Sequence, residues 1–430
     1  AHMQEKGVNL FAQTFEEISG EQLVEFNLKS SRQRVDSTQI GSNIREMSRL
    51  QLLVEVLQRV HRMLSGSDKA KWAEEFVPYL KGSSGQYTYQ LKGKDAHRPH
   101  LEAIGDLMAR LIAELPAVYH QHETWAVLQR VFDEHFNQDD EGNGPKDDGD
   151  LRASSLQSPD DPSASYRNKR GEGYVGYVAN VTETSDTENK FQLILKVQVE
   201  PNTTDDAAML ADIVPELSEK HGLKVMDADG GYGSPEVDEV MAKYGVELHQ
   251  TALRGRSPNK DTFNLADCEL EFDSETDKPT TVTTAAGERL KVEAGRKSHR
   301  FILRPADDKA IYFSQQDVAV ALRRKRCARL KLSGKNPRAA VEATVGAIKR
   351  PFGNDKTPVR GKLRVGMMVI GSALMVNLRR IQRFRTKQQE AGKNQGQSDP
   401  GDSLFSFFKY LAVLFVAQFR SVIAFSALQL

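Results

Sequence analysis

The sequence predicts an α/β protein in which helices flank a mixed sheet, with one helical and one β-rich insertion. Three observations lead to this expectation. Short segments of strand character alternate with segments of helical periodicity over residues 164–255. A long helical stretch follows the first expected strand, and a Thr-rich stretch with few helix signals follows the last one. An alternating order of this kind is typical of a sheet with helices packed on its faces.

The first elements are a helical segment, a strand and a long helical insertion. Residues 4–30 carry apolar side chains near helical spacing. "QRVDSTQI", residues 33–40, predicts a strand because its β-branched residues favour extended backbone. Residues 42–136 are mostly helical in pattern, most clearly in "MSRLQLLVEVLQRVHRML" and "HLEAIGDLMARLIAELPAVYH". We therefore expect the chain to leave the sheet after its first strand and to return to it later.

The central segment predicts most of the sheet. Residues 137–163 are rich in Gly, Asp, Ser and Pro and predict an acidic linker. "GYVGYVANVTET" and "FQLILKVQVEP" predict a hairpin around the polar turn "SDTENK". A helix with Thr204 or Asp205 as its cap and Gly222 as its stop leads to the strand "LKVMDADGG". Ser234 and Pro235 open a further helix, and "VELHQTAL" predicts the last strand of this part.

The final third combines a β-rich insertion, helices and an apolar C-terminal segment. Residues 256–315 predict the β-rich insertion, and residues 316–385 predict helices that complete a core formed with residues 31–41 and 164–255. Residues 386–430 predict a polar linker followed by an apolar helix. Charged and polar residues interrupt that helix, so we expect it to dock on the core or on a second subunit and not to enter a membrane.

Charge and composition limit the classes of function. The chain has 430 residues and a formal net charge of zero, which argues against a uniformly basic DNA-binding protein. The charge is unevenly placed, however, because residues 296–387 hold 24 Lys and Arg against five acids. Such a block predicts a basic face for a polyanion, although a merely solvated surface gives the same pattern. The two cysteines, Cys268 and Cys327, exclude a disulfide framework and favour the cytoplasm.

Three acids stand at positions suited to metal chemistry. Asp36 lies inside the first expected strand, Asp229 ends a later strand before a glycine turn, and Glu342 lies in a late helix. Carboxylates from distant segments that meet in a cleft can hold two Mg²⁺ or Mn²⁺ ions, and such a pair promotes phosphoryl transfer. Asp227 is an alternative to Asp229, because it points to the same side of the strand.

Basic residues surround the third acid in the sequence. Lys335, Arg338, Glu342 and Lys349 recur at spacings that place them on one face of a helix. A carboxylate among cations suits a metal ion beside a DNA phosphate, but a surface stripe of ion pairs explains the spacing equally well.

Several motifs together resemble the DDE transposases of bacterial insertion sequences. They are "RVDSTQIGSNI", "ADGGYGS", "RAAVEATVGAIKRPF" and "VRGKLRVGMMVIGSALMVNLRRI", they occur in the family's order, and the resemblance covers most of residues 7–385. The resemblance implies an RNase H-like fold with Asp36, Asp229 and Glu342 as catalytic metal ligands. Asp161, in "SPDDPSASY", is a weaker alternative for the first ligand because it lies in the acidic linker. In one branch of the family a Tyr-Arg-Glu-Lys motif surrounds the Glu, and here Lys335 replaces the Tyr.

The resemblance implies a transposase that cleaves DNA at transposon ends and joins the freed 3′ hydroxyl to target DNA. It implies two Mg²⁺ or Mn²⁺ ions, double-stranded DNA as partner and a homodimer on that DNA. Expected contacts to phosphates come from Lys335, Arg338, Lys349 and Arg350, and from Arg254 and Arg256 in the basic turn "RGRSPNK". Relatives often carry clustered cysteines in the β-rich insertion, and this chain has only Cys268 there, so we expect no structural zinc. Alternatives are a transposase-derived DNA-binding protein without catalysis and another RNase H-like nuclease.

A cluster of histidines offers a weaker metal site. His120, His122 and His135 lie in "YHQHETWAVLQRVFDEHF". A carboxylate site for Mg²⁺ does not need them, so we expect them to pack on a helix face or to face solvent.

Overall fold

A computed structural model describes most of the chain. The described residues are 9–89, 91, 95–137, 144–169, 171–253, 263–274, 276, 278–295, 300–306, 309–332 and 339–393. The chain divides into two compact units, residues 1–378 and 379–430. The second unit is described over residues 379–393 only, the end of its long helix. The C-terminal apolar segment predicted from the sequence therefore lies outside the described residues.

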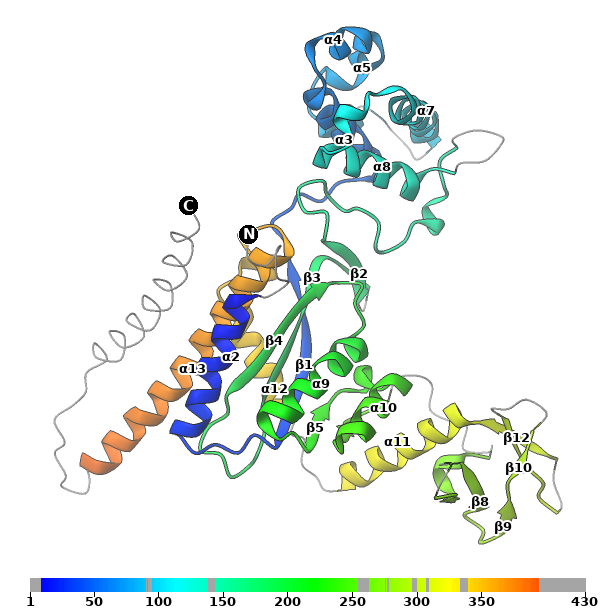
Figure 1. The fold of residues 1–430 in the computed structure, drawn as a ribbon, viewed down its shortest axis with the longest axis vertical. Coiled ribbons are helices and arrows are strands. Elements are labelled where there is room, and N and C mark those ends of the chain that lie inside the picture. Colours follow the sequence, from blue (N-terminus) through cyan, green and yellow to red (C-terminus); the bar gives the residue numbers. More distant parts are fainter. Residues whose placement is uncertain are drawn as a thin grey trace. The chain divides into compact units, whose positions relative to one another are not determined.

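A mixed sheet with helices on both faces forms the centre of the first unit, which confirms the predicted α/β class (Figure 1). Its strands are β1 (Arg32–Gly41), β2 (Ser165–Lys169), β3 (Glu172–Thr184), β4 (Ile194–Pro201), β5 (Val225–Ala228) and β6 (Glu247–Gln250). The order is β2-β3-β1-β5-β6, and β4 pairs with β3. Strand β3 is antiparallel to both β1 and β4. Strand β5 pairs in parallel with β1, and β6 pairs in parallel with β5. The sequence did not predict the short strand β2.

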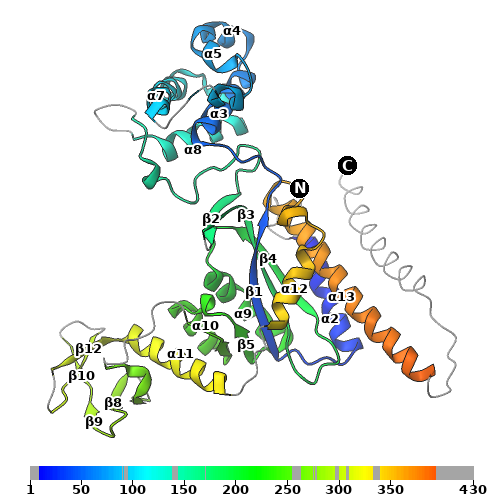
Figure 2. The same ribbon diagram turned by 180° about the vertical axis from the view of Figure 1, so that it is seen from behind.

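Two hydrophobic clusters cover the two faces of this sheet. Helices α9 (Asp206–His221) and α10 (Pro235–Tyr244) pack around Val35 and Met226 on one face. Helices α2 (Leu10–Glu25), α12 (Ala339–Lys349) and α13 (Lys362–Lys393) supply side chains to the cluster around Ile40 and Val181 on the other. Figure 2 gives the reverse view, with β1 in blue. Because residues alternate between faces along a strand, Asp36 belongs to the side of α12.

The helical insertion has a hydrophobic core of its own, centred on Leu53, Trp72 and Met108. Its helices are α3 (Arg49–Met63), α4 (Gly66–Lys71), α5 (Ala73–Leu80), α6 (Ser84–Tyr89), α7 (Arg98–Glu114) and α8 (Glu123–His135). Ser48 caps α3 by accepting a hydrogen bond from the Gln51 backbone N–H, which is why this helix begins where it does.

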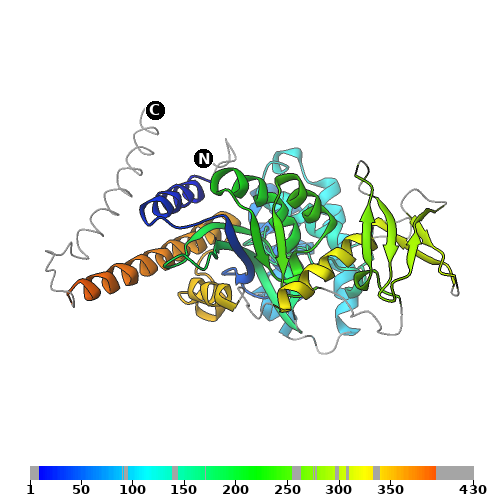
Figure 3. The ribbon, with the colours of Figure 1, turned by 90° about the horizontal axis from the view of Figure 1, so that it is seen from below.

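The β-rich insertion is made of two small antiparallel sheets, shown with the helix that follows them in Figure 3. One contains β7 (Glu269–Phe272), β8 (Pro279–Thr283) and β9 (Arg289–Lys291). The other contains β10 (Glu293–Ala294), β11 (Arg300–Leu303) and β12 (Ile311–Ser314). Helix α11 (Gln315–Leu332) follows, and its Val318 and Ala321 share a hydrophobic cluster with Cys268 and Val282. Over the described residues, no helix has the length and apolar character needed to cross a membrane.

Candidate active site

The two predicted aspartates lie where β1 and β5 diverge. Arg34 on β1 is the register partner of Asp227 on β5, so Asp36 and Asp229 each lie two residues further along their chains. Asp229 has extended backbone angles, and side-chain alternation therefore continues from Asp227 to Asp229. Both predicted ligands consequently belong to the same face and the same end of the β1–β5 pair.

A buried tyrosine lies within electrostatic reach of both carboxylates. Tyr232 is fully buried, and its hydroxyl donates a hydrogen bond of 2.7 Å to Oδ1 of Asn180. Burial raises the pKa of Tyr232 well above its ordinary value, and the charges of Asp206, Asp36 and Asp229 raise it further. Asp36 and Asp229 thus act electrostatically on one hydroxyl.

The glycine turn after Asp229 has a structural cause. Oδ1 of Asp229 accepts a hydrogen bond of 2.6 Å from the Gly231 N–H and so caps the short turn that follows β5. A Cβ at Gly230 would lie 2.6 Å from the Ala252 carbonyl oxygen and 3.0 Å from Cα of Leu253. The chain's own backbone therefore fills the space beside Gly230.

Asp227, the alternative to Asp229, is engaged in a buried ion pair. Its carboxylate accepts hydrogen bonds of 2.8 and 2.9 Å from Arg32 and one of 3.1 Å from the Ser185 hydroxyl. His249 Nδ1 lies 3.7 Å away. Burial would raise the pKa of Asp227, but His249, Arg32 and Ser185 outweigh it and lower that pKa. Asp227 therefore joins strands β1, β5 and β6, a role distinct from that of a metal ligand.

Glu342 lies on the helix that covers this face. Val345 and Ile348 anchor α12 in the hydrophobic cluster beside β1, and Glu342 itself is exposed. Glu342 and Thr38 line the same open hollow of ≈ 530 Å³. Thr38 is two residues from Asp36 on β1 and shares its face. The fold thus brings the third predicted acid to the same side of the sheet as the two aspartates.

The predicted basic residues have different surroundings. Lys349 and Arg350 line the hollow beside Glu342, and Lys349 forms an ion pair with Asp355 while Arg350 is exposed. Four others, Lys335, Arg338, Arg254 and Arg256, lie outside the described residues. Of the predicted phosphate contacts, the structure therefore locates two beside the candidate site.

The sequence reasoning missed a buried charged group next to the site. Glu183 on β3 is completely buried and accepts a hydrogen bond of 2.8 Å from Nε of Arg34. The Thr344 hydroxyl contacts both oxygens of Glu183, at 2.8 and 3.0 Å. These bonds fix α12 over β1 and β3. An acid among the alternating residues of "VTET" was the available signal.

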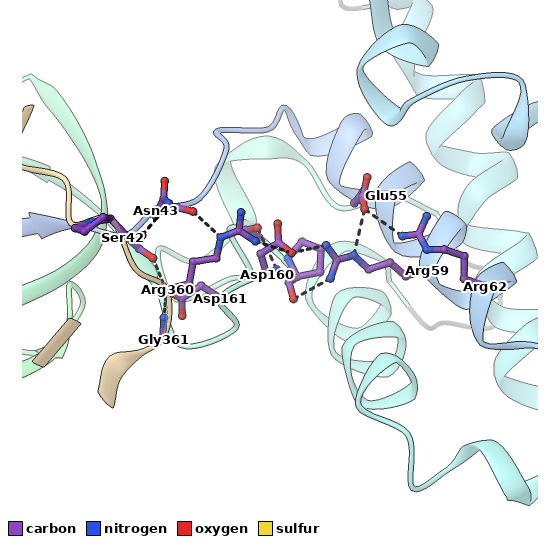
Figure 4. A network of polar contacts seen from close by, with 12 residues as sticks. Ser42, Asn43, Glu55, Arg59, Arg62, Asp160, Asp161, Arg360 and Gly361 are labelled. Carbon is purple, nitrogen blue, oxygen red and sulfur yellow. Dashed lines mark hydrogen bonds and ion pairs between the residues drawn. The ribbon is translucent and has the colours of Figure 1, made fainter. Parts of the chain in front are cut away.

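Asp161 is buried, although the sequence led us to expect a solvated acid in a linker. Its Oδ2 accepts hydrogen bonds from the Ser42 hydroxyl and, at 2.8 Å, from the Gly361 N–H. Its Oδ1 accepts one of 2.5 Å from the Tyr177 hydroxyl. The expectation was wrong because the linker folds back onto the ends of β1 and β3. With both oxygens engaged, Asp161 connects three segments (Figure 4).

The neighbouring Asp160 extends this polar network toward the helical insertion. It accepts a hydrogen bond of 2.7 Å from Arg59 on α3 and forms an ion pair of 3.2 Å with Arg360 (Figure 4). Arg360 also donates to the Asn43 carbonyl at 2.7 Å. The acidic linker thus provides specific contacts to both the insertion and the core.

The three predicted ligands supply only oxygen donors, which Mg²⁺ prefers. Within the described part of the chain, however, no three or more His, Cys, Asp or Glu side chains are grouped so as to hold a metal ion. Asp36, Asp229 and Glu342 share one side of the sheet without forming a closed ligand cluster.

The histidines have structural surroundings. The His120 ring stacks on Trp125 with centroids 4.4 Å apart, and His122 caps α8 by accepting a hydrogen bond from the Thr124 N–H. His135 is buried, and burial together with the charges of Arg49 and Lys146 lowers its pKa to about 4.

Comparisons with known proteins give no match. No family model fits the chain, and neither a curated protein nor a solved structure is significantly similar to it.

Proposed function

We propose that this chain is a DNA transposase that cleaves transposon-end DNA and transfers the freed strand to a target, with Asp36, Asp229 and Glu342 as catalytic residues. The observation that carries the proposal is that strand register and alternation put Asp36 and Asp229 on one face at the same end of the β1–β5 pair, on the side of α12, which carries Glu342. A first strand, an antiparallel hairpin and two parallel strands with intervening helices support an RNase H-like fold.

Two divalent cations, Mg²⁺ or Mn²⁺, are the proposed cofactors. When bound, such a pair activates the attacking oxygen and stabilises the leaving oxygen of a phosphodiester. Because the described carboxylates are not closed into a cluster, the proposal requires Glu342 to approach the aspartates when cations and DNA bind. Residues on the exposed side of α12 can move in this way while Val345 and Ile348 remain packed.

The remaining residues of the site orient the DNA and the helix. Thr344, bonded to the buried Glu183, holds α12 in register over β1. Arg350 is exposed beside the hollow and can contact a backbone phosphate. Such a contact leaves the neighbouring ion pair between Lys349 and Asp355 intact. The homodimer expected on paired DNA ends belongs to the same proposal.

A nicking assay with a matched control tests the proposal. Labelled linear DNA is incubated with Mg²⁺ and the wild-type chain, Asp229→Asn or Asp212→Asn, which changes an exposed acid on α9. Wild type and Asp212→Asn should nick the DNA, whereas Asp229→Asn should lose at least a hundredfold in rate, since one metal ligand is removed. Equal nicking by all three proteins would refute the assignment.

A DNA-binding protein without catalysis is the second candidate. The absence of a closed group of metal-ligating side chains among the described residues favours it. Under this alternative, all three proteins would bind DNA and none would nick it with Mg²⁺ or Mn²⁺. Binding of Mn²⁺, followed by its electron paramagnetic resonance signal, separates the two, because only the transposase requires an Asp229-dependent ion.

A further inference from the structure

The helical insertion contains a large cavity that the proposed cleavage chemistry does not use. It has a volume of ≈ 940 Å³, and its lining includes Arg45, Gln51, Tyr79, Lys81, Tyr87 and Tyr89. Small-molecule sites commonly have volumes of about 300–1,000 Å³. The size therefore suits a ligand larger than a few waters.

The wall of the cavity is held in place by several polar contacts. Nε2 of the buried Gln58 donates hydrogen bonds of 2.7 and 2.8 Å to the carbonyls of Tyr79 and Gly82. The Ser84 hydroxyl donates to Glu55 at 3.1 Å, and the Ser83 N–H to Gln86 at 2.8 Å. The loop between α5 and α6 is thus fixed before any ligand arrives.

Aromatic rings form one part of the lining. The rings of Tyr79 and Tyr87 lie 5.5 Å apart, and the Tyr87 hydroxyl is 2.7 Å from Nδ1 of His100. Tyr89, which also lines the cavity, is 89% exposed, so most of its ring surface is accessible. Planar ligands stack on such rings, and nucleic-acid bases do so whatever their sequence.

The charge of the lining is positive. Arg45 and Lys81 are exposed cations, and no Asp or Glu is among the described residues that line the cavity. A Cβ at Gly85 would lie 3.0 Å from Nη2 of Arg45, so the glycine lets that guanidinium lie close against the wall. An anionic group is therefore favoured at this end of the cavity.

A buried amide without a partner adds a polar requirement. Gln51 is 8% exposed, and its Nε2 has no hydrogen-bond partner among the described residues. A buried donor without a partner destabilises the structure that contains it. A ligand with acceptor atoms on a planar ring would satisfy this donor once the amide turns toward the cavity.

We propose that this cavity binds a nucleotide, with its base against Tyr87 and Tyr89, its phosphate at Arg45 and Lys81, and its base edge toward Gln51. The nucleotide is either free or an unpaired unit of a DNA strand, and the two share this chemistry. The inference is independent of the proposed cleavage reaction, because none of the lining residues belongs to the candidate active site.

Fluorescence of 2-aminopurine, which stacking quenches, tests the inference. The full chain is titrated, without divalent cations, into 2-aminopurine deoxyribonucleoside monophosphate, into a single-stranded oligonucleotide containing one 2-aminopurine, and into that oligonucleotide hybridised to its complement. Quenching of the free nucleotide, of the single strand, or of both supports the site and identifies the source. Two results would overturn the proposed site. One is equal quenching of the single strand and the duplex without quenching of the free nucleotide, and the other is no quenching of any of the three probes.

Matched variants keep the test specific. Tyr89→Ala should weaken binding about fivefold or more, since stacking on an aromatic side chain is lost, and Arg45→Ala should weaken it and reduce its salt dependence. Tyr312→Ala and Arg62→Ala change exposed residues outside the cavity and should leave affinity unchanged. Because Tyr89 is exposed, its removal leaves the fold intact, and equal affinities for Tyr89→Ala and Tyr312→Ala would refute the site. Nicking with Mg²⁺ is assayed separately, so failure of one proposal does not decide the other.

Discussion

Truncation of Asp161 should destabilise the protein strongly, even though the residue lies in the segment predicted as an acidic linker. The carboxylate accepts hydrogen bonds from Ser42, Tyr177 and the Gly361 N–H, and it is 1% exposed. A hydrogen bond to a charged group contributes about 1.5–3 kcal/mol, and these bonds are not additive. The hydroxyls of Ser42 and Tyr177 can rotate after truncation, whereas the Gly361 N–H cannot. We therefore expect Asp161→Ala to lower the free energy of unfolding by about 4 kcal/mol.

Two further substitutions separate the charge from the hydrogen bonds. In Asp161→Asn the amide oxygen can still accept from Ser42 and Gly361, and its NH₂ group can donate to the Tyr177 hydroxyl. The expected loss is about 1–2 kcal/mol, because the bonds remain and the charge is removed. Asp160→Ala removes partly exposed ion pairs to Arg59 and Arg360 and should cost about 1 kcal/mol or less.

Urea unfolding followed by circular dichroism measures these differences, and nicking of linear DNA is assayed on the same proteins. The expected order of destabilisation is Asp161→Ala, then Asp161→Asn, then Asp160→Ala. Equal stability of Asp161→Ala and Asp160→Ala would contradict the argument from burial. A stable Asp161→Ala protein that cannot nick DNA would instead make Asp161 a catalytic residue, the alternative left open by the sequence.

Three other predictions concern the turn, the strand pairing and the basic surface. Gly230→Ala should lower the free energy of unfolding by about 1–3 kcal/mol, because its Cβ would overlap the Ala252 carbonyl. Gly20→Ala on α2, where the space is open, should raise it by about 0.5 kcal/mol. Thermal unfolding of the two variants compares these effects. Asp227 raises the pKa of His249, so this pair stabilises the fold fully below pH about 6.5 and less as pH rises through the higher folded pKa. The stability gap between wild type and His249→Gln should therefore shrink from pH 5.5 to 8.5, and a gap that widens would show the opposite sign. DNA affinity should fall steeply with salt concentration, and Arg350→Glu should weaken binding to all sequences and make the dependence of affinity on salt less steep. Filter binding at several salt concentrations measures both effects. An affinity independent of salt would contradict the predicted basic face for a polyanion.

The local elements were largely readable from the sequence. The β-branched residues of "QRVDSTQI" predicted a strand at residues 33–40, and the structure has β1 at Arg32–Gly41. A cap at Thr204 or Asp205 and a stop at Gly222 predicted α9. In the structure Asp205 is the cap, since it accepts a hydrogen bond from the Ala207 N–H, and Gly222 adopts a left-handed conformation. These features were predictable because caps, stops and strand propensity act within a few residues.

The candidate site was predictable only in part. Residue order alone placed Asp36 and Asp229 at strand positions, and strand pairing then brought them to one end of the β1–β5 pair. The choice between Asp227 and Asp229 needed the structure, because both have the same strand parity. Arg32 and Asp227 are 195 positions apart in the sequence, and only the pairing of β1 with β5 brings them together. Their 2.8 Å ion pair identifies Asp227 as structural.

By itself, the sequence determined the order of helices and strands, the two insertions and the chemical character of the candidate ligands. Tertiary structure decided what each buried charge contacts. Asp161, Glu183 and Asp227 look alike in sequence as acids in polar or strand segments, yet all three are buried against partners from distant segments. The physical reason is that a buried carboxylate is stabilised only by donors that long-range pairing brings to it, and no pattern of neighbouring residues contains that information.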